Sequence, residues 1–272
     1  MTGTLYVVAT PIGNLEDITL RASRVLAEVG LIAAEDTRQT RKLLSHLGIK
    51  THLVSYNEHN AAQREPRLLR TLLKSDMALV SDAGVPVISD PGAGLVRAAA
   101  AQGTPVVPIP GPSAVTTALA AAGMNGDAFR FVGFPPRARK ARRTLFERLA
   151  AERDTLVLFE APHRIRATLE DMASALGERA IVVCRELTKF HEEVFRGTAE
   201  ESLAHFALPR GEFVIVIEGD QRPVISDTDT DGAQKALATL KAAGETRRDA
   251  VAQVTDAYGV SKREAYRLWL EV

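Results

Sequence analysis

The alternation of short apolar runs with helical patterns in the first 125 residues is the strongest constraint on the fold. These runs are continuously apolar, which is typical of strands buried on both faces. They are TLYVVA (4–9), LIAAE (31–35), THLVSY (51–56), MALVSD (77–82) and PVVPIP (105–110). Strands of this kind separated by helices predict an open α/β domain with a parallel sheet between helical layers.

The rest of the chain predicts three further parts. In the second part EEVFRGT (192–198) follows AIVVCRE (180–186) with no helix between them, so we expect a mixed sheet rather than a repeat of the first domain. A polar, aspartate-rich stretch then predicts a linker. The expected division is 1–125 and 126–219 as α/β domains, 220–232 as the linker, and 233–272 as a helical C-terminal extension.

The last two expected helices meet at Gly259 and Ser261, residue types that end one helix and cap the next. This pattern resembles a helix-turn-helix motif, and it equally fits two helices that only pack together. We favour plain packing.

Charge and composition limit the functional classes. Lys and Arg together number 34, as do Asp and Glu, so overall charge predicts no polyanionic partner and nucleic-acid binding requires a local patch. The single cysteine, Cys184, excludes an internal disulfide and a cysteine-rich metal site. No apolar run approaches 18 residues and no signal-peptide pattern is present, so we expect a cytoplasmic protein with no membrane partner.

Polar or Gly/Pro-rich loops follow all five predicted strands of the first domain. They are ATPIGN (9–14), EDTR (35–38), SYNEHN (55–60), SDAGVPVISDPG (81–92) and PGPSA (110–114). Ligands of open α/β domains bind at the carboxyl ends of strands, so five such loops favour a site there. Walker, GxGxxG and GxSxG motifs are absent, as is any His/Cys spacing for a metal. A cationic nucleoside such as S-adenosylmethionine fits these acidic loops, but composition alone does not select it.

Seven motifs together resemble the tetrapyrrole methylase superfamily. The first domain contributes four of them: ATPIGNLEDITLRA, AAEDTR, SDAGVPVISDPG and PGPSA. The second domain contributes FEAPHRI, CRELTKFHEE and GEFVIVIEG, so the resemblance spans about residues 3–219. Within the superfamily they are similar to the branch that methylates small-subunit ribosomal RNA. One departure is Val85, where that branch usually has threonine. The change is tolerable if the position works through its backbone.

The resemblance implies a two-domain methyltransferase with S-adenosylmethionine in the cleft between its domains. The scattered histidines and the single cysteine separately predict no metal site. It implies 2′-O-methylation of a cytidine ribose in the decoding region of 16S ribosomal RNA, within the small ribosomal subunit, by a homodimer. The implied cofactor-binding residues are Pro11, Asp82, Ala83, Gly84, Ile88, Ser113, Ala114, Phe159, Glu160, Leu187 and Glu212.

A ribose hydroxyl is a weak nucleophile, so positioning and a general base are the expected sources of rate. Candidate catalytic residues at strand exits are Asp36, Glu160, Glu186 and Lys189, and Arg38, Arg185 or Lys189 could hold a phosphate. The segment PPRARKARR (135–143) is the densest local basic patch. The expected RNA-binding residues are Arg38, Arg137, Arg139, Lys140, Arg142 and Arg143, with Arg247, Arg248, Lys262, Arg263 and Arg267 extending the surface.

Two other functions remain open at this stage. A small-molecule methylase acting on a tetrapyrrole would share the cofactor cleft, although the basic segment and the helical extension argue against it. A non-catalytic RNA- or ribosome-binding protein would need neither an intact cofactor site nor a base, and the intact loops argue against that function.

Overall fold

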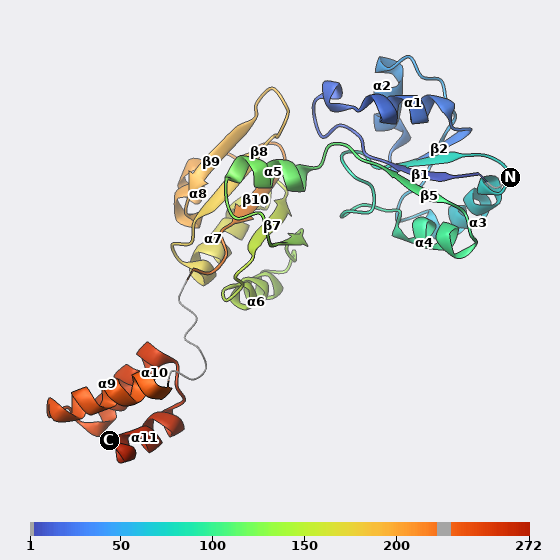
Figure 1. Ribbon diagram of the computed structural model, residues 1–272. Coiled ribbons are helices and arrows are strands. Elements are labelled where there is room, and N and C mark those ends of the chain that lie inside the picture. The colour runs from blue at the N-terminus through green and yellow to red at the C-terminus, as the bar shows by residue number, and fades with distance from the viewer. Residues whose placement is uncertain (1–2, 222–229) are drawn as a thin grey trace. The chain divides into compact units, whose positions relative to one another are not determined.

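The structure is a computed structural model that describes residues 3–221 and 230–272 (Figure 1). The chain divides into two compact units, residues 1–220 and residues 221–272. Most of the linker predicted at 220–232 lies outside the described residues, and residues 230–232 are helical.

The first sheet is entirely parallel, as the continuous apolar runs predict. Its strands lie in the order β3-β2-β4-β1-β5. Their bounds are β1 Leu5–Val8, β2 Leu31–Ala34, β3 Leu53–Ser55, β4 Met77–Val80 and β5 Val106–Ile109. The helices that follow β1 to β4 are α1 Leu20–Glu28, preceded by the 3-10 turn η1 Leu15–Asp17, α2 Thr37–His46, α3 Ala61–Leu72 and α4 Ala93–Ala101.

Both faces of this sheet are buried, because successive residues of a strand point to opposite faces. Ala78 and Val80 of β4 pack in one core cluster with residues of α1 and α2, and Leu79 packs in the other with residues of α3 and α4. The neighbouring strands β1 and β4 therefore lead to helices on opposite faces. Such a point in the strand order leaves a crevice at the carboxyl ends of the strands.

The second sheet is mixed, which confirms the expectation from the two consecutive strands. Its order is β6-β7-β10-β8-β9, in which only β6 and β7 pair in parallel. The strands are β6 Phe129–Gly133, β7 Thr155–Glu160, β8 Ile181–Arg185, β9 Glu193–Gly197 and β10 Phe213–Ile217. On one face, the strands share a core with residues of α6 Arg139–Leu149, α7 Ile165–Leu176 and α8 Ala199–His205.

The helix α5, Ala114–Ala122, covers the other face of the second sheet (Figure 1). It follows β5 in the chain, so the predicted boundary at residue 125 assigns it to the first sheet. Instead, Ala118 and Ala122 pack in a cluster with Val182 and Val214 of the second sheet. The packing of α5 thus differs from that boundary, while the four-part division as a whole stays a prediction.

Residues 230–272 of the C-terminal unit, which the structure describes, form three helices with a core of their own. They are α9 Thr230–Ala242, α10 Arg247–Tyr258 and α11 Lys262–Glu271. Leu237, Val254 and Leu268 are buried together, one from each helix. Gly259 ends α10 in a left-handed conformation with φ of 65°, and the Ser261 hydroxyl caps α11 by accepting from Glu264 N–H at 3.1 Å. None of the helices in the described ranges combines the length and apolar character needed to cross a membrane.

Candidate functional site

A cavity of about 530 Å³ lies at the carboxyl ends of the first sheet and is closed by residues of the second. Of the eleven residues predicted to bind a cofactor, all but Pro11 line it. These ten residues are Asp82, Ala83, Gly84, Ile88, Ser113, Ala114, Phe159, Glu160, Leu187 and Glu212. The structure thus brings the predicted residues together, and their contact with a cofactor stays a prediction.

Sequence reasoning missed the other residues that line this cavity. They are Ile12, Glu35, Val85, Ser89, Asp90, Val115, Phe134, Ala161, Pro162, His163, Cys184, Phe213 and Val214. Glu35 and Asp90 lie inside motifs that had been singled out, and the segment 161–163 directly follows Glu160, so these residues carried a signal. Cys184 begins the motif CRELTKFHEE, whereas Phe134 carried no signal, because an isolated apolar residue does not indicate which surface it covers.

The loop after β4 is held by backbone hydrogen bonds to the loop after β1 and by carboxylate hydrogen bonds to the loop after β2. Gly84 has φ of 78°, a conformation that favours glycine, and it exchanges two backbone hydrogen bonds with Thr10 at 2.9 and 3.0 Å. The Asp82 carboxylate accepts from Asp36 N–H at 2.9 Å, and Asp82 N–H donates to Glu35 at 3.3 Å. These contacts fix the polar groups of three strand exits around one cavity.

Backbone strain is concentrated at the same cavity. Among the described residues, positive φ at non-glycine positions occurs only at Val87, Ser89, Glu186 and Thr188. The first pair flanks Ile88 and the second pair flanks Leu187, and both of these side chains line the cavity. Such conformations cost on the order of 1–3 kcal/mol each and are retained mainly at functional sites.

Three carboxyl groups give the cavity its electrostatic character. Burial raises the pKa of Glu35, Asp82 and Asp90 above their ordinary values, since removing a carboxylate from water disfavours its charged form. Neighbouring carboxylates raise these pKa values further. A bound cation would relieve both effects, so the site favours a positively charged ligand.

The second sheet supplies an aromatic wall. Phe159 makes edge-to-face contacts with Phe131 and Phe134 at centroid distances of 4.9 and 5.6 Å. Glu160 beside it is fully buried, and its carboxylate accepts from the Thr168 hydroxyl at 2.6 Å and from Ala161 N–H at 2.8 Å. It also pairs with Arg164 at 3.3 Å, so Glu160 supports the wall and has little capacity left to act as a base.

The other candidate bases are also engaged. The Arg38 guanidinium donates to both carboxylate oxygens of Asp36 and lowers the pKa of that group to about 2. Burial opposes ionisation of Glu186, but hydrogen bonds from Lys189 and from Glu212 N–H outweigh it and lower the pKa. Lys189 itself spans Glu186 and Glu212 at 2.8 and 2.9 Å. Neither carboxylate is suited to accept a proton near neutral pH.

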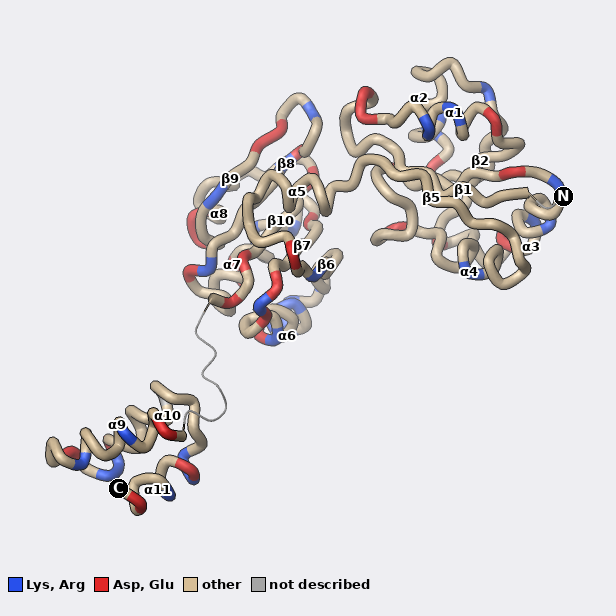
Figure 2. The backbone as a smooth tube through the Cα atoms, in the orientation of Figure 1, with Lys and Arg blue, Asp and Glu red and all other residues tan. Residues whose placement is uncertain are grey.

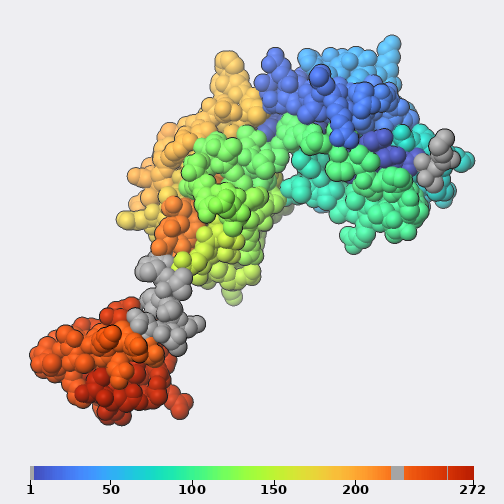
Figure 3. Space-filling view, viewed as in Figure 1, coloured from blue at the N-terminus to red at the C-terminus, as the bar shows by residue number. Residues whose placement is uncertain are grey.

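Loops from the two sheets also meet beside the cavity. Asn14 N–H donates to the Thr188 hydroxyl at 3.1 Å, and in the space-filling view the dark blue N-terminal segment abuts the yellow-orange segment before β9 (Figure 3).

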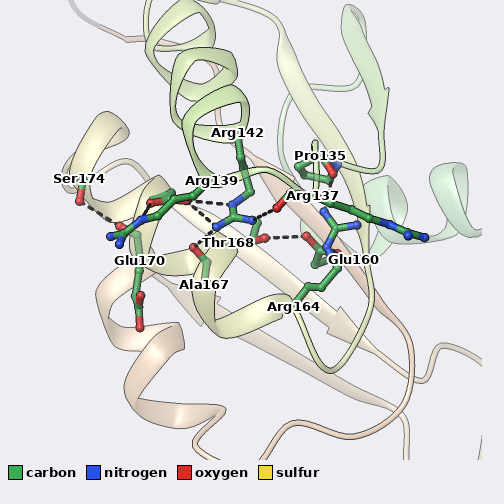
Figure 4. Close-up of polar contacts among 11 residues, drawn as sticks. Pro135, Arg137, Arg139, Arg142, Glu160, Arg164, Ala167, Thr168, Glu170 and Ser174 are labelled. Atoms are coloured by element: carbon green, nitrogen blue, oxygen red, sulfur yellow. Dashed lines mark hydrogen bonds and ion pairs between the residues drawn. The ribbon is translucent and has the colours of Figure 1, made fainter.

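The basic segment lies at the start of α6, where Lys and Arg residues gather (Figure 2). Arg137, Arg139, Lys140 and Arg143 are exposed. Arg142 is a correction to the predicted RNA-binding set, because its side chain is only 6% exposed and pairs with buried Asp171 at 2.7 Å. The same guanidinium donates to the carbonyls of Arg137 and Ala167 (Figure 4). The N–H donors of Arg142 are therefore used in hydrogen bonds within the protein rather than for RNA phosphates.

Comparison with known proteins identifies the family. Residues 4–203 match the family described as Tetrapyrrole (Corrin/Porphyrin) Methylases. The chain belongs to this family. It is therefore a methyltransferase, and S-adenosylmethionine is its methyl donor, as the seven motifs had suggested.

Curated relatives of higher identity share one name within this family. The protein named Ribosomal RNA small subunit methyltransferase I of Halalkalibacterium halodurans is 46% identical over 273 residues, covering 98% of this chain and 94% of that protein. The protein of the same name from Thermotoga maritima is 47% identical over 222 residues, covering 80% of this chain and all of that protein.

Solved structures confirm the fold. The methyltransferase CobJ matches with a TM-score of 0.61 at 18% identity, covering 82% of this chain and 97% of that one. Uroporphyrin-III-C-methyltransferase from Thermus thermophilus matches with a TM-score of 0.55 at 23% identity, covering 79% and 94%. The predicted fold class, two α/β parts with an additional helical extension, is confirmed.

The residues of the cavity fit this methyl donor. The buried carboxyl groups of Glu35, Asp82 and Asp90 suit a cationic sulfonium and the hydroxyls of a ribose, which donate hydrogen bonds to carboxylates. The apolar wall of Phe159 and Leu187 suits a nucleobase and a thioether chain.

Proposed function

We propose that this methyltransferase transfers a methyl group to the ribose 2′-hydroxyl of a cytidine in the decoding region of 16S ribosomal RNA. The observation that carries the proposal is identity of 43–47% with proteins named Ribosomal RNA small subunit methyltransferase I, in several cases over nearly the whole chain. The cavity and the basic segment supply the two binding surfaces that such a reaction needs.

In this proposal the cavity and the basic segment have separate functions. Carboxylates after β2 and β4 hold the donor, and the Phe159 wall excludes water from it. Exposed Arg137, Arg139, Lys140 and Arg143 bind RNA phosphates. Most of the rate then comes from holding the hydroxyl in line with the bond that breaks.

A tetrapyrrole acceptor has less support. The tetrapyrrole enzymes among the solved structures are 23% identical or less, so they speak for the fold alone. The relatives of higher identity are named for ribosomal RNA.

We further propose that the enzyme is a cytoplasmic homodimer that acts on the small ribosomal subunit rather than on free RNA. Light scattering of the purified protein tests the dimer, and a mass equal to one chain would contradict it. Comparing methyl transfer to assembled subunits and to extracted RNA tests the substrate.

The decisive experiment maps small-subunit ribosomal RNA by mass spectrometry in cells with and without this gene. We expect one 2′-O-methylcytidine to disappear without the gene and to return with the wild-type chain. Asp82→Ala should not restore it, whereas Asp127→Ala, which removes an exposed carboxylate just before β6, should. An unchanged map would contradict the ribosomal function and direct the search to small-molecule acceptors.

A further inference from the structure

A second, more polar cavity of about 430 Å³ adjoins the strand exits of the first sheet. It is formed by the loops after β2 and β3 and the start of α2. All of its lining residues are polar: Glu35, Asp36, Thr37, Arg38, Ser55, Asn57, Glu58 and His59. This composition contrasts with the aromatic and aliphatic wall of the larger cavity and suits a ligand rich in hydrogen-bonding groups.

Glu35 is the residue that the two cavities share. One of its carboxylate oxygens, Oε2, accepts from Asp82 N–H at 3.3 Å, while Asp82 accepts from Asp36 N–H at 2.9 Å. These bonds hold the exit of β2 against the exit of β4 and fix Glu35 at the junction. Its other oxygen, Oε1, has no hydrogen-bond partner in the part of the chain that the structure describes.

The far wall of the polar cavity is held rigidly. The Asn57 side-chain amide donates to the Ser55 hydroxyl at 3.3 Å, and its carbonyl oxygen accepts from His59 N–H at 3.2 Å. Asn60 also donates to the Ser55 hydroxyl, at 3.1 Å. The exposed Glu58 therefore lies in a loop that hydrogen bonds of Asn57 and Asn60 hold in place.

We propose that the polar cavity binds the acceptor nucleotide and that Glu35 takes the proton of its 2′-hydroxyl. The inference rests on the proposed function. When the donor occupies the larger cavity and the nucleotide the polar one, the reacting oxygen lies at their junction, where Glu35 stands. The hydroxyl oxygen forms the bond to the methyl carbon, the methyl–sulfur bond breaks with its electron pair remaining on sulfur, and the proton passes to the carboxylate.

The charges around Glu35 suit this role. Burial raises its pKa, and the carboxylates of Asp90, Asp82 and Glu58 raise it further, against the hydrogen bond from Asp82 N–H. His59 and the Asp36–Arg38 pair face the same polar cavity. A carboxylate with a raised pKa is a stronger base than Asp36 or Glu186, whose pKa values are lowered.

The polar cavity also offers groups that recognise a cytidine nucleotide. The Glu58 carboxylate has no hydrogen bond among the described residues and can accept from the exocyclic amino group of cytosine. Arg38 has an 83% exposed side chain whose Nη1 is not used by Asp36, so it can donate to a phosphate.

The test measures single-turnover methyl transfer to purified small ribosomal subunits with labelled S-adenosylmethionine. Glu35→Gln keeps an oxygen that can accept from Asp82 N–H, so the junction should stay folded. We expect a rate about 100-fold to 10,000-fold lower and loss of the acid limb of its pH profile. Affinity for the donor, measured by calorimetry, should fall far less than the rate, because Asp82 and Asp90 still face the sulfonium. Glu28→Gln, on the exposed face of α1, is the matched control and should retain the full rate.

A Glu35→Gln rate within about threefold of wild type, with an unchanged pH profile, overturns the role of Glu35. A second variant, Glu58→Gln, should raise KM for the subunit and leave kcat nearly unchanged; an unchanged KM overturns the cavity assignment. If the wild-type enzyme transfers no methyl group to the subunit, the proposed function itself fails, and that outcome is distinct from the other two.

Discussion

The buried ion pair of Arg142 and Asp171 allows a sharp test of the distinction between fold and RNA contact. Both side chains are almost fully buried, at 6% and 2% exposure, with 2.7 Å between Nη2 and Oδ2. Arg139 contacts the same carboxylate at 3.4 Å, but its own side chain is 71% exposed. Two arginines on one helix thus share a partner and differ in burial.

Arg142→Met removes the buried cation and leaves the Asp171 carboxylate in a low-dielectric environment. Breaking such a pair costs about 3–5 kcal/mol, which corresponds to roughly 6–20 °C in melting temperature for a unit of this size. Arg139→Met breaks an exposed contact and should cost less than about 1 kcal/mol. The double variant Arg142→Met with Asp171→Leu should recover most of the loss, because no unpaired charge remains buried.

Far-ultraviolet circular dichroism during urea unfolding measures these differences for the larger unit. The single tryptophan, Trp269, lies in the C-terminal unit, so its fluorescence transition is an internal control that should not shift. RNA affinity should show the reverse order, falling for Arg139→Met and staying near wild type for folded Arg142→Met. Equal destabilisation by the two single variants would refute the argument from burial.

Three further predictions follow from the cavity and the C-terminal unit. Gly84→Ala should destabilise the enzyme by about 1–2 kcal/mol in thermal unfolding and weaken donor binding, because the φ of 78° at residue 84 is strained for a residue with a side chain. Wild-type stability of this variant would contradict the prediction. Binding of cationic S-adenosylmethionine should release protons in acidic solution, because the bound cation lowers the raised pKa values of Glu35, Asp82 and Asp90. Calorimetry in buffers of different ionisation enthalpy measures this release, and proton uptake would contradict the reasoning. A chain ending at Asp220 should bind the donor with wild-type affinity, because every residue that lines the larger cavity lies in the unit of residues 1–220, and a tenfold loss in calorimetry would contradict it.

The first sheet was predictable because a strand that is buried on both faces has a continuously apolar sequence. All five predicted runs contain the observed strands. The sequence predicted that the second sheet is mixed, but it did not predict the order of its strands. That order depends on the pairing of β10 with β7 and β8, which are distant in the sequence. The place of α5 was hidden for a similar reason: its alanine-rich face fits either sheet, and only the three-dimensional packing decides.

The candidate site was predictable where motifs carried it, as the ten cavity residues show. The error at Arg142 came from treating five basic residues as one surface. Arg142, Phe146 and Leu149 are buried at spacings of four and three residues, the period of one helix face. That spacing is visible in the sequence and would have placed this arginine inward. No local pattern, by contrast, marks Glu35 over Asp36, since their difference arises from which carboxylate meets Arg38.

The passage of the chain from β5 into α5 has a mechanical consequence. Ser113, Ala114 and Val115 line one side of the larger cavity, and α5 packs on the second sheet, while Asp82 belongs to the first. Any change in the angle between the two sheets must then pass through the short segment 110–113, where Pro110 and Pro112 restrict the backbone. A ligand that contacts both Asp82 and the start of α5 restricts the motion of the two sheets relative to each other. Its binding should therefore slow amide hydrogen exchange in both sheets together.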